Sequence, residues 1–191
     1  MDSTDSQRTS HKGLWIGLAS VIGICVIIAI ITIPTAFKQL TQTRTFRLSN
    51  DSMQPTLYNG DLITVDTGYY SEHSVADGDL IVFRHDGVVL VKRISAISGE
   101  TIEGKNDKLI RNGSVLAEPY VKSPDEPSDP SEASFPLRIV SQGQVFVTGD
   151  WRSKSLDSRY PDYAPVHLSD IVGKVVYIYS SSHSGQVGRK F

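Results

Sequence analysis

Ser52 lies in the segment SNDSMQPTLYNGD, residues 49–61, where it is followed by Met53 and by the stiff pair Pro55-Thr56. Serine is a common turn former. A serine hydroxyl can also act as a nucleophile, but only when a neighbouring base takes its proton. The segment is compatible with both roles, so the rest of the chain must supply a base or exclude one.

Lys92, in the segment GVVLVKRI (residues 87–94), is the strongest candidate for that base. Alternation along a strand would place Arg93 on one face and Lys92 on the other, together with Leu90 and Val88. Burial on an apolar face lowers the pKa of a lysine, because it disfavours the ammonium form, and a neutral lysine can act as a general base. The alternative is that the side chain reaches water at a sheet edge and does no chemistry.

Histidines offer a second kind of base, in a Ser-His-Asp triad. None of the five lies in a motif that pairs it with a serine and a carboxylate, but triads are recognised by geometry and not by sequence order. The five are His11, His73, His85, His167 and His183. The triad therefore remains an alternative at this stage.

Strands must position these groups, because short alternating or β-branched runs follow one another from about residue 43 onward. A hairpin is predicted over residues 78–97 around His85-Asp86-Gly87, and Asn112-Gly113 predicts a second turn. Long amphipathic helical patterns are missing from this region, so we expect a mainly β domain with an antiparallel sheet. Further strands are predicted within residues 44–49, 61–66, 108–121, 141–150 and 170–180.

One segment of this region, residues 123–136, breaks the strand pattern. It reads SPDEPSDPSEASFP and is rich in proline, serine and acidic residues. Such a composition buries little apolar surface, so we predict a solvated loop.

The run LWIGLASVIGICVIIAIITI, residues 14–33, is apolar, and no charged residue lies between Lys12 and Lys38. A helix of this length spans roughly 30 Å, the thickness of bilayer hydrocarbon. Trp15 lies near one end, where an interfacial aromatic side chain belongs. The run therefore predicts one N-terminal transmembrane helix that anchors the protein.

A cleaved signal peptide is the competing interpretation of this run. The apolar core of a signal peptide is usually about 7–15 residues long and ends in a small-residue cleavage site. This run is longer, and no A-x-A pattern follows it. Positive charges flank both ends, so the charge count does not decide the orientation. The predicted division is a short cytoplasmic tail (1–13), a transmembrane anchor (14–37) and an extracytoplasmic catalytic domain (38–191).

The overall composition narrows the function classes. The formal net charge of −2 gives no basic footprint for nucleic acid. Cys25 is the single cysteine, which excludes an internal disulfide and a zinc site built from cysteines.

Five segments, in this order behind the predicted anchor, resemble the motifs of bacterial type I signal peptidases. These are membrane-anchored Ser-Lys proteases that remove signal peptides. The resemblance covers nearly the whole chain, and the short length with a single span resembles the form typical of Gram-positive bacteria. The segments are SMQPTL (52–57), GDLIVF (78–83), VKRI (91–94), RNGSVLAEPYV (111–121) and GDWRSKSLDSRY (149–160).

Two positions depart from the family pattern. Trp151 stands where the last motif usually has asparagine, and Ser98-Gly99-Glu100 stands where Pro-Gly-Asp is usual. Neither change removes a catalytic side chain, but the tryptophan brings the packing near the site into question.

The resemblance implies a catalytic role for several residues. Ser52 attacks the scissile carbonyl, Lys92 takes the serine proton, and the Ser52 backbone N–H stabilises the oxyanion. Ser155 matches a second hydroxyl that orients the lysine ammonium. Asn50, two residues before the nucleophile, is either a second donor to the oxyanion or a turn former.

Two ion pairs are also implied by the resemblance. Asp150 matches an aspartate that neutralises Arg93, and Asp157 with Arg159 matches a structural ion pair. An unpaired charge beside Lys92 would shift the lysine pKa or cost burial energy.

The implied substrates are signal peptides of preproteins, with small residues at positions −1 and −3, so the pockets should be shallow and apolar. An extended substrate can pair with a sheet edge and present alternate side chains to one surface. The implied lining is Phe46, Leu48, Met53, Leu57, Leu90 and Val91; ordinary core packing is the alternative for each except Met53. The other expected partners are the lipid bilayer and the secretion translocon, with no nucleic acid, no cofactor and no metal.

Three other functions remain as alternatives. One is a signal-peptidase-like enzyme dedicated to a few substrates, and another is a membrane-tethered assembly factor or chaperone-like relative without activity. A third is a Ser-Lys autoprotease similar to the SOS-response repressors. Those repressors carry a DNA-binding helix-turn-helix, whereas the first 40 residues here hold the predicted anchor.

Overall fold

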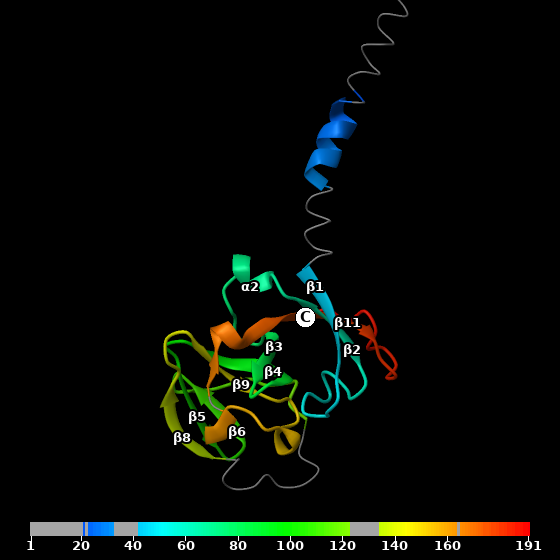
Figure 1. Ribbon diagram of the computed structural model, residues 1–191. Helices are drawn as coiled ribbons and strands as arrows, with labels where there is room; N and C mark the ends of the chain where they lie inside the picture. Colours follow the sequence, from blue (N-terminus) through cyan, green and yellow to red (C-terminus); the bar gives the residue numbers. More distant parts are fainter. Residues whose placement is uncertain (1–20, 22, 33–41, 123–133, 164) are drawn as a thin grey trace, which may run out of the picture. The chain divides into compact units, whose positions relative to one another are not determined.

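The computed structural model describes residues 21, 23–32, 42–122, 134–163 and 165–191 (Figure 1). The chain divides into two compact units, Met1–Gln42 and Thr43–Phe191, and in the first of them residues 23–32 are helical. Within the described ranges, no helix is both long enough and apolar enough to cross a membrane. Most of the anchor predicted over 14–37, and all of the tail predicted over 1–13, lie outside these ranges.

The second unit is built on two antiparallel sheets, which confirms the mainly β prediction. The larger sheet has seven strands in the order β1-β2-β11-β3-β4-β9-β10, and the smaller has the order β7-β6-β5-β8. Figure 1 shows β5, β6 and β8 gathered together, with β3, β4 and β9 forming a separate group. The strands are β1 Thr43–Arg47, β2 Leu62–Asp66, β3 Leu80–His85, β4 Val88–Ile97, β5 Thr101–Lys105, β6 Lys108–Arg111, β7 Ser114–Val115, β8 Phe135–Ile139, β9 Gln144–Thr148, β10 Val166–His167 and β11 Ile171–Ser180.

Helical structure in this unit is limited to short turns. The four-residue helix α2, Tyr69–Glu72, follows β2. The 3₁₀ turn η1, Arg152–Lys154, follows β9, and η2 (Pro161–Tyr163) and η3 (Leu168–Asp170) lie on either side of β10.

Both predicted turns are present. β3 ends at His85 and β4 begins at Val88, and the two loop residues Asp86 and Gly87 have φ values of 47° and 78°. Positive φ at both positions is the conformation of a type I′ hairpin turn. Asn112-Gly113, with φ values of 51° and 77°, connects β6 to β7 in the same way.

The smaller sheet contains two strands that the sequence did not predict, β5 and β8. β8 includes Phe135 and Pro136, which were predicted to belong to the loop over 123–136. Pro136 is tolerated because β8 is an edge strand, where a missing N–H costs little. Gly104 of β5 makes room for Phe135, since a Cβ at this glycine would lie 2.6 Å from the phenylalanine ring. This contact between distant residues explains why local patterns missed the pairing.

The hydrophobic core fixes the loop between β1 and β2. Leu48, Met53 and Leu57 of this loop are buried in one cluster with Val91 of β4. Burial of such side chains is worth about 1.5–3 kcal/mol each. The loop is therefore held against β4, with Ser52 next to Met53 in the sequence.

Candidate active site

Ser52 is held in position by hydrogen bonds as well as by packing. Its side chain is buried, with 3% of the residue exposed. The Leu48 N–H donates to Asp61 O and the Gly60 N–H to Leu48 O, both at 2.9 Å, which closes the base of the loop. The Trp151 N–H donates to Ser52 O, also at 2.9 Å, and ties the loop to the segment after β9. Ser52 is thus a turn residue and a positioned hydroxyl at once.

Lys92 points at this hydroxyl. Its residue is 2% exposed, and Nζ donates a hydrogen bond of 2.6 Å to Ser52 Oγ. Burial lowers the pKa of Lys92 from 10.5 to about 8; Asp157 and Asp150 oppose this shift and Arg159 adds to it. The alternative in which Lys92 reaches water is therefore wrong, and the pair has the geometry and the pKa of a nucleophile with its base.

The described histidines contact residues other than Ser52. His73 lies against the Tyr69 ring and His85 against the Tyr163 ring. His183 stacks on a tyrosine, Tyr58, and His167 contacts Gln144, whereas His11 lies outside the described residues. Among the hydrogen bonds of the described residues, none joins a histidine to Ser52, so the triad alternative has no geometric basis here.

Asn50 also contacts the serine. Its Oδ1 accepts a hydrogen bond of 2.8 Å from Ser52 Oγ and one of 3.2 Å from Ser52 N. A cavity of about 180 Å³ lies next to Asn50, Ser52 and Lys92. It is lined by Asn50, Ser52, Leu90, Lys92, Lys154, Leu156 and Tyr163. Lys154, Leu156 and Tyr163 were not singled out from the sequence, although the first two flank Ser155 in the last motif.

Arg93, the neighbour of Lys92, lies in a different environment. Its Nε and Nη2 donate to the two carboxylate oxygens of Asp150 at 2.9 and 2.7 Å. Nη1 donates to Gly78 O at 2.9 Å, and the guanidinium lies 3.9 Å from the centre of the Tyr120 ring. Thr56 Oγ1 donates to Asp150 as well. Because Asp150 is fully buried, Arg93 supplies the opposite charge that its burial requires.

Asp157 and Arg159 form a second buried pair. Arg159 Nε donates to Asp157 Oδ1 at 2.8 Å, and the Gly149 N–H donates to Asp157 Oδ2 at 2.9 Å. Burial alone would raise the pKa of Asp157, but Arg159 and the Gly149 N–H hold it below its ordinary value. The carboxylate is therefore ionised and already paired, which limits its pull on the Lys92 proton.

Ser155 lies in the site but does not hydrogen-bond to Lys92. It is buried, and its Oγ is near enough to the Asp157 carboxylate to help lower that pKa, yet no partner of good hydrogen-bond geometry lies around it in the described part of the chain. Gly149 packs against it: a Cβ at Gly149 would lie 2.2 Å from Ser155 Oγ and 2.6 Å from Ser52 O. Only glycine leaves room for both serines.

The six residues expected to line substrate pockets divide into two groups. Leu90 lines the cavity at Ser52, and Phe46 is half-buried at the edge of the core cluster. The other four, Leu48, Met53, Leu57 and Val91, are buried in that cluster, with exposures of 8%, 2%, 0% and 7%. The alternative of core packing thus describes these four, including Met53.

Trp151, where the family motif has asparagine, does not line the cavity at Ser52. Its backbone N–H bonds to Ser52 O, but its ring lies against the Lys122 ammonium, 3.3 Å from the ring centre. The indole N–H is buried without a hydrogen-bond partner among the described residues. The side chain therefore packs against Lys122 and does not line the cavity.

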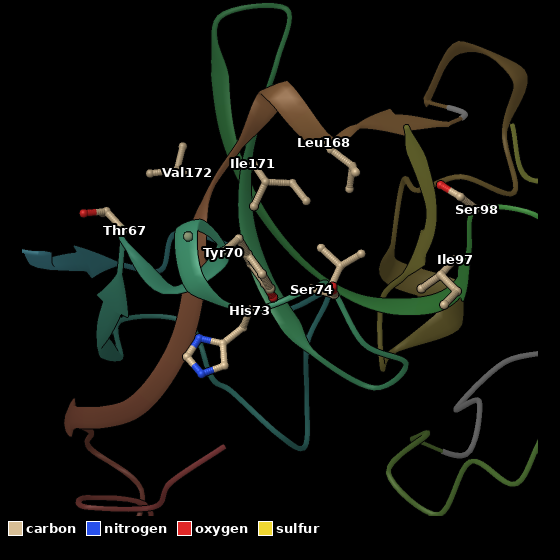
Figure 2. A pocket seen from close by; sticks show the side chains of 11 residues that line it. Thr67, Tyr70, His73, Ser74, Ile97, Ser98, Leu168, Ile171 and Val172 are labelled. Atoms are coloured by element: carbon tan, nitrogen blue, oxygen red, sulfur yellow. The ribbon is translucent and has the colours of Figure 1, made fainter. Parts of the chain in front are cut away.

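A second cavity of about 450 Å³ lies apart from Ser52 and Lys92. Figure 2 shows its lining, which includes Tyr70, His73, Ile97, Leu168 and Ile171. It is the larger of the two, but it contains neither the nucleophile nor the base, so size alone does not locate the active site.

Comparisons with known proteins identify the family of this chain. The family described as "Signal peptidase, peptidase S26" matches residues 15–180. "Probable signal peptidase I-1" of Synechocystis is 34% identical over 152 residues, which cover 74% of each chain. "Signal peptidase I S" of Bacillus subtilis is 31% identical over 159 residues, covering 81% of this chain and 83% of that protein.

A crystal structure of a signal peptidase I from Enterococcus faecalis is also similar. It covers 55% of this chain and 98% of its own, at 28% identity and a TM-score of 0.46. The family match extends over most of the chain and includes every residue of the Ser52 site. The chain therefore belongs to the peptidase S26 family and is an enzyme of the signal peptidase I type.

Proposed function

We propose that this enzyme is a membrane-bound serine endopeptidase that removes N-terminal signal peptides from exported preproteins, after small residues at positions −3 and −1. Ser52 is the nucleophile and Lys92 the general base. The observation that carries this proposal is the buried pair, in which Lys92 Nζ lies 2.6 Å from Ser52 Oγ. Burial brings the pKa of Lys92 to about 8, so a useful fraction of the lysine is neutral near physiological pH.

The reaction follows from these two groups. Neutral Lys92 takes the Ser52 proton as Oγ attacks the scissile carbonyl, and the ammonium then gives that proton to the leaving amine. Water, deprotonated by the same lysine, attacks the acyl-enzyme carbon and releases the signal peptide with a new carboxylate. Lys92 is neutral again after acylation, and in deacylation it passes the water proton to Ser52 Oγ as the ester bond breaks, so only the full cycle returns both groups to their starting protonation states.

The oxyanion of each tetrahedral intermediate needs hydrogen-bond donors beside Ser52, at the position of the substrate's scissile carbonyl oxygen. The Ser52 backbone N–H is the first, as expected from the family. The Asn50 carboxamide is the proposed second: its oxygen accepts from Ser52 Oγ and Ser52 N in this structure, which places the side chain beside the nucleophile, and its Nδ2 group is the donor in this proposal. Loss of such a donor typically lowers kcat by about 10²–10³, so Asn50→Ala should show a loss of this size.

The supporting residues keep Lys92 able to lose its proton. Asp150 is held by Arg93, and Asp157 by Arg159, so neither carboxylate pairs directly with the lysine. Ser155 is buried beside them, and in this proposal its hydroxyl orients the ammonium when the proton is on Lys92.

Small residues at −1 and −3 fit the dimensions of the site. The cavity at Ser52 is only about 180 Å³, and Leu90 gives it an apolar wall. In this proposal Phe46 and Leu90 contact the extended substrate, while Leu48, Met53, Leu57 and Val91 support the pocket from the core.

The proposed location is the cell membrane, with a single span over residues 14–37 and the catalytic domain on the extracytoplasmic side. The basis is the uncharged apolar run together with the family match that begins at residue 15. The proposed partners are preprotein signal peptides, the bilayer and the secretion translocon.

The test is to incubate the purified full-length chain with a panel of preproteins and to sequence each new N-terminus. Cleavage after A-x-A-like sites by the wild type, and none by Ser52→Ala, is the expected result. Processing of only one or two preproteins would indicate a dedicated enzyme, and no processing of any would contradict the proposal in favour of an assembly factor.

A further inference from the structure

The Ser52 backbone N–H already donates a hydrogen bond in this structure. Its partner is the side chain of Asn50, at 3.2 Å. A backbone N–H can only donate, so the atom that faces it must be the carboxamide oxygen and not the nitrogen. One proton serves one acceptor well, and the same N–H is the proposed donor to the oxyanion.

The serine hydroxyl is also turned toward Asn50. Lys92 Nζ donates to Ser52 Oγ at 2.6 Å, and Ser52 Oγ donates in turn to Asn50 Oδ1 at 2.8 Å. In this chain of donors the serine proton points away from Lys92. Ser52 cannot give its proton to the base until it releases Asn50, so the arrangement is that of a resting site.

We propose that the Asn50 carboxamide oxygen occupies, in the resting enzyme, the place of the substrate's scissile carbonyl oxygen, so that the substrate must displace it before Ser52 attacks. The inference rests on the proposed function, since it takes the Ser52 N–H as the oxyanion donor. Displacement is sterically open because Asn50 is exposed. Among the described residues, the hydrogen bonds of its side chain go only to Ser52.

Rotation of the displaced carboxamide reconciles this contact with the donor role. When the substrate oxygen takes the Ser52 N–H, a half-turn of the Asn50 amide brings Nδ2 toward that oxygen as a second donor. Asn50 thus blocks the Ser52 N–H in the free enzyme and donates to the oxyanion when substrate is bound. The contact makes Asn50 a positioning residue at rest and a catalytic residue only with substrate bound.

Two variants separate the closing role from the donor role. Asn50→Asp keeps the acceptor and loses the donor, whereas Asn50→Ala loses both. The probe is a signal peptide with a methylated scissile nitrogen, which keeps the carbonyl and resists cleavage. The full-length chain in detergent should bind this peptide at least about tenfold more weakly as Asn50→Asp than as Asn50→Ala, because an acceptor with a negative charge holds the N–H more strongly. Equal binding by the two variants would overturn the proposal.

The amide signal of Ser52 gives a readout without substrate. With ¹⁵N-labelled serine, the Ser52 N–H resonance should move upfield in Asn50→Ala, where its acceptor is lost, and downfield in Asn50→Asp. Asn59→Ala, at an exposed position of the same loop, is the matched control and should leave it in place. An unchanged Ser52 resonance in Asn50→Ala would overturn the proposal. Failure of the wild type to process any preprotein would overturn the proposed function, whereas the resonance shifts would still show whether Asn50 occupies the Ser52 N–H.

Discussion

Lys92 and Arg93 are neighbours in β4, and both cationic side chains are buried, yet they are surrounded very differently. Lys92 hydrogen-bonds to the neutral Ser52 hydroxyl at 2.6 Å. Arg93 instead makes a two-bond ion pair with Asp150, at 2.9 and 2.7 Å, and faces the Tyr120 ring. The same strand therefore carries the proposed general base on one face and a buried ion pair on the other.

The difference shows how burial lowers the pKa of Lys92. The two carboxylates whose charge acts on Lys92 are Asp157 and Asp150, and each is bound to an arginine. Their negative charge is largely compensated by Arg159 and Arg93, so desolvation dominates at Lys92 and lowers its pKa. Arginine cannot lose its proton in this way, because its delocalised guanidinium stays charged in proteins.

The largest expected effect is on catalysis at the Lys92 face. Ser52→Ala and Lys92→Met should each lower preprotein cleavage by more than about 10³-fold while the protein stays folded. Lys92→Arg should be equally inactive, since the guanidinium remains charged. Cleavage is measured by gel and mass spectrometry, with Lys108→Met, at an exposed lysine of β6, as the matched control. Substantial activity in Lys92→Arg would show that deprotonation at this position is not required.

The two neighbours should respond in opposite directions when stability is measured. Arg93→Met leaves the buried Asp150 unpaired and should lower the free energy of unfolding by about 3–5 kcal/mol. Lys92→Met removes a poorly compensated buried cation and should raise it by about 1–3 kcal/mol. Urea unfolding at pH 7 measures both.

The pH dependence of stability follows from the same pKa shift. The pKa of Lys92 in the folded state, about 8, is below its ordinary value of 10.5. The unfolded state therefore binds more protons between these values, so this residue's contribution to stability rises with pH from about 8 to 10.5, and its full penalty is present at pH 7.

If Arg93→Met and Lys92→Met changed the free energy of unfolding in the same direction, the contrast drawn between these two neighbours would be wrong.

Gly149 lies between the surroundings of Lys92 and those of Arg93, because it packs against Ser52 and Ser155 and precedes Asp150 in the chain. In Gly149→Ala the added Cβ meets Ser155 Oγ at 2.2 Å and Ser52 O at 2.6 Å. Overpacking of this kind costs about 1–3 kcal/mol, and displacement of Ser52 should lower kcat by about 10–100-fold. Melting temperature and kcat are the measurements.

A double variant locates the strain at Gly149. Gly149→Ala with Ser155→Gly removes the clash with the serine side chain but keeps the clash with Ser52 O. It should recover part of the melting temperature of Gly149→Ala. Full recovery of both stability and kcat would mean that the Ser52 backbone adapts freely.

The acid limb of the activity profile reports on Lys92 alone. Because the neutral lysine is the base, kcat/KM should rise about tenfold per pH unit below the Lys92 pKa, level off above about 8 and stay high on the alkaline side. A limb near pH ~6.5 that disappears in a single histidine variant would return the histidine base to consideration.

The smallest effect is expected at Trp151, since its ring lies against Lys122 and does not line the cavity. Trp151→Asn should change kcat/KM by less than about threefold, because its backbone bond to Ser52 O does not depend on the side chain. Rates are compared across a panel of signal peptides. A change of more than tenfold for some of them would place the indole in substrate selection after all.

Local sequence patterns determined much of the architecture. Alternation around Lys92 correctly separated it from Arg93, and the Asp86-Gly87 and Asn112-Gly113 turns were readable because positive φ favours these residue types. The strands β5 and β8 were missed, since their pairing depends on Phe135 filling the space left by Gly104, a contact across 31 positions that no local window contains.

At the candidate site, the sequence by itself determined which residue types are present: a serine in a turn, a lysine in an apolar strand and two aspartates with arginines nearby. The tertiary structure alone decided how they interact. It placed Lys92 Nζ within 2.6 Å of Ser52 Oγ, gave the described histidines hydrogen-bond and ring contacts other than Ser52, buried Met53 in the core and turned the Asn50 oxygen toward Ser52. The physical reason is that strand alternation fixes the face on which a side chain lies, whereas partners and burial depend on which distant segments pack against that face.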